Sequence, residues 1–78
     1  MTPWAWVREH RATADPALVR CVRLSLIVRR LGSRARAVTV VHPAWSRFTR
    51  LMLARDECYL ALCGASAAAF VEIMRGVP

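Results

Sequence analysis

The chain has 78 residues, of which 56% are hydrophobic and 22% are charged, and its formal net charge is +7. This composition excludes an intrinsically disordered chain, and the length allows one small domain, residues 1–78, with little interior to spare for an elaborate active site. The longest uncharged run, residues 58–71, is shorter than the roughly 20 residues that a transmembrane helix needs, so we predict no membrane span.

The first predicted element is a short helix over residues 3–11. Thr2 is a good N-cap residue, and Pro3 is the residue type preferred at the first helical position. Trp4, Val7 and Arg8 then recur at helical spacing.

The next segment allows two interpretations. Asp15-Pro16 repeats the helix-start signal and would open a helix over residues 16–31. At helical spacing, however, the arginines appear scattered, whereas at period two four apolar residues share one face: Val22, Leu24, Leu26 and Val28. We therefore predict a strand over residues 19–29.

A second strand is predicted over residues 37–41, which are rich in β-branched residues, after a turn at Gly32-Ser33. The two strands would form a β-hairpin, which is the most basic part of the chain. Residues 1–36 have a net charge of +6 and residues 37–78 a net charge of +1. The hairpin would carry five arginines on one strand face and near its tip: Arg23, Arg29, Arg30, Arg34 and Arg36.

His42-Pro43 should end that strand and begin a helix. Apolar residues at three- and four-residue steps predict an amphipathic helix to about Ala54. The apolar run over residues 58–62 then predicts a buried strand, and Ser66 a cap for a last helix. The apolar stripe of that helix would be Phe70, Ile73 and Met74.

The predicted fold is therefore a small α/β (α+β) domain with the order α-β-β-α-β-α. The strand at 37–41, its following helix and the strand at 58–62 would form a right-handed βαβ unit. Together with the basic hairpin, this arrangement predicts a three-stranded mixed sheet with helices packed on it.

Catalytic chemistry has little support in the sequence. Cys63, between a predicted strand and a helix, is the best candidate for a nucleophile, because a helix N-terminus lowers a thiol pKa. Cys58 is on the opposite strand face, and neither His10 nor His42 has a neighbouring acid or second ligand. Glycine patterns for nucleotides are absent as well. We expect no enzyme, no cofactor and no metal, with a Cys63-dependent thiol enzyme as the remote alternative.

The basic hairpin favours a non-enzymatic binding protein. A two-stranded ribbon can enter the DNA major groove, and arginine bonds guanine or phosphate with two donors. We therefore expect nucleic acid as the partner, and no small-molecule substrate. The alternative is an acidic protein surface, with the chain acting as an accessory subunit or inhibitor that docks through Trp4, Trp6 and the hairpin, because Trp and Arg are common at interface hot spots. A homodimer is a further expectation.

The source and compartment are also suggested by composition. All twelve basic residues are arginine, and lysine, asparagine and glutamine are absent, as in proteins of GC-rich genomes. We expect a high-GC bacterium or one of its phages, and some of the positive charge reflects codon usage. Charged residues near the start, such as Arg8, argue against a signal peptide, and three cysteines are an odd number for a disulfide framework. These features predict a cytoplasmic protein with reduced thiols.

Overall fold

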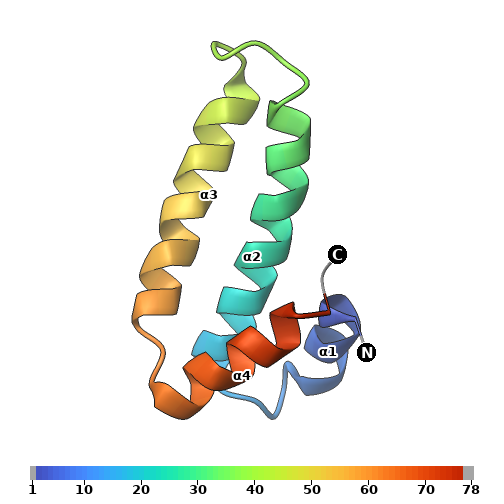
Figure 1. Cartoon of the computed structure of the whole chain (residues 1–78), viewed down its shortest axis with the longest axis vertical. Coiled ribbons are helices and arrows are strands. Elements are labelled where there is room, and N and C mark those ends of the chain that lie inside the picture. Colours follow the sequence, from blue (N-terminus) through green and yellow to red (C-terminus); the bar gives the residue numbers. More distant parts are fainter. Residues whose placement is uncertain (1, 77–78) are drawn as a thin grey trace.

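The computed structural model describes residues 2–76 and is all-helical over that part of the chain. The four helices are α1 (Pro3–His10), α2 (Pro16–Ala35), α3 (Pro43–Leu60) and α4 (Gly64–Met74). The long helices α2 and α3 lie side by side, and α1 and α4 pack against one end of this pair (Figure 1). The predicted α/β fold with its three-stranded sheet, β-hairpin and βαβ unit is therefore wrong.

The short N-terminal helix is confirmed. It begins where the Thr2-Pro3 signal places it, and the backbone N–H of Ala5 donates to Thr2 Oγ1 at 3.2 Å. It ends at His10, one residue before the predicted boundary. Local capping chemistry is sufficient to define this element.

The predicted strand at 19–29 lies inside α2 instead. Asp15 caps the helix, because its Oδ1 accepts from the N–H of Ala17 at 3.0 Å. Five buried residues recur at alternating four- and three-residue steps along the helix: Cys21, Ser25, Val28, Gly32 and Ala35. Apolar residues do stand at every second position over residues 22–28. The residues that α2 buries toward α3, however, recur at the longer period of a helix.

These five residues, here called the small-residue seam, are on the side of α2 that meets α3. A Cβ added at Gly32 would lie 3.5 Å from the ring of Phe48 in α3. Small side chains let two helix backbones approach closely, so large aromatic residues of α3 can pack directly against α2. The seam explains why α2 and α3 form the most extensive helix contact of the fold.

The other two predicted strands are also absent. Residues 37–41 form the connection between α2 and α3, held by its own turns and by Trp45 Nε1, which donates to the carbonyl of Val38 at 3.4 Å. Val40 and Val41 are 79% and 91% exposed, because no neighbouring strand covers them. Residues 58–60 end α3, which continues past Ala54 through exposed Asp56 and Glu57.

The last helix starts earlier than predicted. Cys63 occupies the N-cap position of α4 and makes no side-chain cap hydrogen bond. Ser66 does not cap the helix, because its hydroxyl donates instead to Asp15 Oδ2 at 3.0 Å. One carboxylate thus caps α2 and also links its start to α4.

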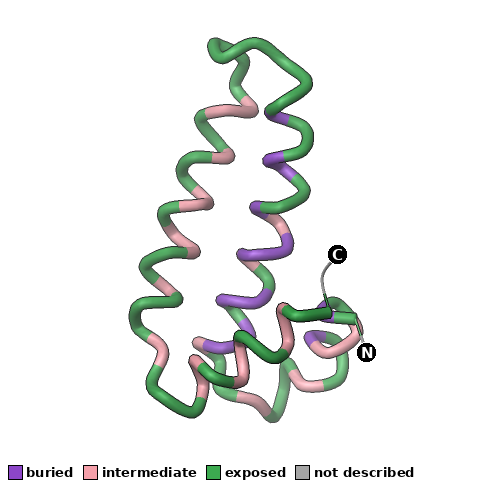
Figure 2. Tube along the Cα trace, viewed as in Figure 1, coloured by how far each residue is buried: buried purple, intermediate pink, exposed green. Residues whose placement is uncertain are grey.

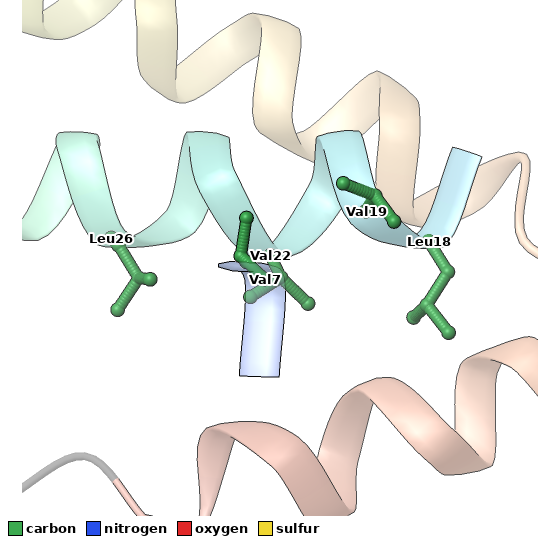
Figure 3. Close-up of a cluster of buried hydrophobic side chains, with 5 residues drawn as sticks. All are labelled: Val7, Leu18, Val19, Val22 and Leu26. Atoms are coloured by element: carbon green, nitrogen blue, oxygen red, sulfur yellow. The ribbon is translucent and has the colours of Figure 1, made fainter. Parts of the chain in front are cut away.

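The core lies at the end where all four helices come together. It consists of a cluster of buried aliphatic side chains from α1 and α2: Val7, Leu18, Val19, Val22 and Leu26 (Figure 3). Leu62 and the predicted α4 stripe of Phe70, Ile73 and Met74 pack against it. In α3 and α4 no residue is fully buried, and buried positions concentrate along α2 (Figure 2).

Candidate nucleic-acid interface

The exposed outer side of α2 carries a row of arginines. The outer arginine row comprises Arg20, Arg23, Arg30 and Arg34, all exposed. With Ile27 between Arg23 and Arg30, the steps are three, four, three and four residues, which keeps successive side chains on one face of a helix. At 1.5 Å per residue the row extends over about 21 Å.

The charged residues of this face are all positive. The helix α2 contains five arginines and no acidic residue. Two ion pairs occur among residues 2–76, Arg55–Asp56 at 2.9 Å and Arg75–Glu72 at 3.0 Å, and neither involves α2. Within residues 2–76 the outer arginine row therefore has no carboxylate partner, and its guanidinium groups are available for an external anion.

A shallow pocket of about 480 Å³ adjoins the first half of the row. Arg11, Arg20 and Arg23 supply its charge, while Val19, Leu24 and Ile27 supply an apolar lining. The lining contains no carboxylate. This combination suits a ligand that presents negative charge beside an apolar surface, such as phosphates beside sugars.

The structure separates the five arginines that the sequence grouped together. Arg23, Arg30 and Arg34 belong to the outer row, but consecutive residues of a helix are about 100° apart, so Arg29 is on another face from Arg30. Arg29 and Arg36 line a different pocket, between α2, α3 and α4. Arg20 and Arg11 are not among the residues predicted from the sequence. A search for arginines at alternating three- and four-residue steps would have found Arg20, whereas Arg11 joins the site only through the packing of α1.

The two N-terminal tryptophans do not form one surface. Trp4 is 39% exposed. Trp6 packs against the core cluster and stacks on His10 with ring centroids 5.1 Å apart. Trp4 thus retains an exposed face, while Trp6 contributes to the fold.

The thiols and histidines are not arranged around a common centre. Cys63 is exposed, Cys58 is half-buried in α3, and Cys21 is buried. His42 caps α3, since its Nδ1 accepts from the N–H of Ala44 at 3.1 Å, and His10 Nδ1 contacts the carbonyl of Trp6 at 3.0 Å. Both histidines thus bond to the backbone, and neither bonds to Cys63.

Three further findings bear on function. No family model, curated protein or solved structure matches the chain. Across residues 2–76, no helix is sufficiently long and apolar to cross a membrane. In the same part of the chain, no three His, Cys, Asp or Glu side chains gather as they would around a metal ion.

Proposed function

We propose that this chain is a non-enzymatic binding protein that docks on the phosphate backbone of a double-stranded nucleic acid through the outer arginine row of α2. The observation that supports this proposal is the spacing of Arg20, Arg23, Arg30 and Arg34, which aligns four exposed cations without carboxylate partners along one helix face. Arginine suits phosphate because its planar fork offers two parallel donors.

A duplex is favoured over a single strand by the residues around the row. Proteins that bind single strands stack the bases on aromatic side chains. The residues of the row and of the adjoining pocket include no aromatic residue. Phosphate contacts made from a rigid helix need only a regular backbone, which a duplex supplies.

Salt dependence gives a quantitative test. Each phosphate contact contributes about 0.9 to the slope of log K against log salt, so four contacts give about 3.6. Raising salt from about 50 mM to about 200 mM should then weaken binding about 150-fold. Fluorescence anisotropy with a labelled random duplex and a labelled random single strand measures both the slope and the preference.

Two variants with equal charge separate the row from the net charge. The row variant changes Arg20, Arg23, Arg30 and Arg34 to Gln. The control variant changes four other arginines to Gln: Arg8, Arg47, Arg50 and Arg75. We expect the row variant to lose duplex binding and its salt slope while the control retains most of both. If both variants lost duplex binding equally, binding would depend on the net charge of the chain and not on the outer arginine row.

The protein-partner alternative has its own signature in the same assay. If Trp4 anchors a protein partner and the arginines serve only solubility, the wild-type chain will not bind the duplex even at low salt. That result would contradict the proposed function and direct the search to Trp4, whose truncation should then cost about 2 kcal/mol of binding if it is a hot spot.

A further inference from the structure

The α2–α3 pair has an uncovered apolar groove on the side where α4 packs. In Figure 1, α4 crosses the start of α2 at one end of the pair and leaves the other end without a third helix. A pocket of about 620 Å³ continues from α4 along the pair. Its apolar lining, here called the α2–α3 groove, comprises Val28, Gly32, Phe48, Met52, Phe70 and Met74.

The side chains of this groove are suited to binding an apolar ridge. The ring of Phe48 packs over Gly32 and remains half-buried. Met52 and Met74 are unbranched and adapt their shape to a ligand. Phe48, Met52, Phe70 and Met74 are all half-buried, so the groove presents apolar area that the fold itself covers only in part.

The rim of the groove is positively charged. Arg29, Arg36 and Arg55 line it, and no acidic residue does. Arg55 is held by Asp56, with Nε and Nη2 donating at 3.1 and 2.9 Å. Arg29 and Arg36 are exposed, make no ion pair within the described residues, and are two helical turns apart, which is about 10 Å.

We infer that the α2–α3 groove is the docking site for an acidic amphipathic helix of a partner protein. Apolar residues of that helix at i, i+3, i+4 and i+7 would fill the groove, as in other helix-in-groove complexes. Carboxylates two turns apart on its flank would pair with Arg29 and Arg36. This surface is distinct from the outer arginine row, so the inference does not depend on the proposed function.

Charge decides between this occupant and a second copy of the chain. The whole sequence contains five acidic residues against twelve arginines. The long helix α2 contains no acidic residue and α3 contains two, one of which is paired with Arg55. A second copy would therefore bring mainly arginines to a rim that is already positive, whereas an acidic helix removes that repulsion.

The probe is a fluorescein-labelled synthetic helix of about 20 residues, long enough to be helical, with leucine along the apolar seam and glutamate on both flanks. A second peptide of the same pattern carries lysine in place of glutamate. We expect anisotropy to show binding of the glutamate peptide to the wild-type chain and no binding of the lysine peptide. Equal affinity for the two peptides would overturn the inference.

Matched variants locate the site. Because the altered residues are exposed, R29E/R36E should stay folded by circular dichroism. It should lose affinity for the glutamate peptide by about 10-fold, since two attractive pairs become repulsive. The control R20E/R23E, equal in charge but on the outer row, should keep the affinity. An unchanged affinity in R29E/R36E, or a dimer in sedimentation that R29E/R36E dissociates, would overturn the inference.

Discussion

The two halves of α2 contribute to the molecule in different ways. The first half is enclosed by α1 and α4, and its large aliphatic residues form the core with Val7. The second half packs mainly against α3, where the seam residues Gly32 and Ala35 are buried, and it exposes Arg29, Arg30, Ser33 and Arg34. One helix therefore combines an anchored half, which supplies stability, with an open half, which borders the α2–α3 groove, and the outer arginine row runs along both halves.

The largest effect should follow from placing a charge in the anchored half. Val22 is fully buried, so Val22→Asp would enclose an unpaired carboxylate at a cost of about 3–5 kcal/mol, a large share of the stability of a small domain. We expect loss of the helical circular dichroism signal at room temperature. A matched change outside the core, Val40→Asp at a 79% exposed position in the α2–α3 connection, should leave the signal intact. Comparable losses in both variants would contradict the assignment of Val22 to the core.

The buried thiol Cys21 gives a pH-dependent test. Burial, and then the neighbouring Cys58, raises the pKa of Cys21 from 9.0 to about 11. At neutral pH it therefore has about 100-fold less thiolate than an ordinary cysteine, and native alkylation should modify exposed Cys63 well before Cys21. Above pH 9 the unfolded chain releases this proton while the native state keeps it, so stability falls between pH 9 and about 11.

Substitution identifies the residue responsible. Cys21→Ala should flatten the alkaline decline in denaturant midpoint, while Cys63→Ala should not change it. If Cys21 of the native protein were alkylated as quickly as Cys63, solvent and reagent would have access to the small-residue seam, and the burial described for Cys21 would be wrong.

The smallest effect concerns the seam itself. Gly32→Ala should stabilise α2 by up to about 1 kcal/mol, because alanine is the better helix former and its Cβ would make an ordinary 3.5 Å contact with Phe48. Thermal unfolding should shift upward by up to about 4–8 °C. Gly32→Leu, which extends into the Phe48 ring, should lower the midpoint instead. A lower midpoint for Gly32→Ala would mean that α2 and α3 approach more closely than described.

Local signals mark the starts of three helices, and two of these starts are predicted correctly. Thr2-Pro3 and His42-Pro43 identify the starts of α1 and α3, because capping depends on neighbouring residues alone. Asp15-Pro16 carries the same information for α2, but the apolar residues at alternate positions over 22–28 favour a strand, and that prediction is wrong. The β-branched run at 37–41 fits a strand only if another strand pairs with it, and none does.

The site was predictable only in part, for a related reason. Three of the five predicted arginines fall in the outer row, because residues four and seven positions apart on one helix share a face. Arg29 and Arg36 would share a surface with these three arginines only if the segment were a β-hairpin. Once the segment is helical, their phase assigns them to the groove. The groove itself depends on α4 covering only one end of the pair, which no local pattern specifies.

The division of α2 into two functional faces can be tested most directly by an amide-resolved NMR titration of the wild-type chain with a short duplex at low salt. We expect shifts along the outer face, at Arg20, Arg23, Ile27, Arg30 and Arg34, with the groove residues Gly32 and Phe48 unchanged. Shifts centred on the groove, or no shifts at all, would contradict the proposed function.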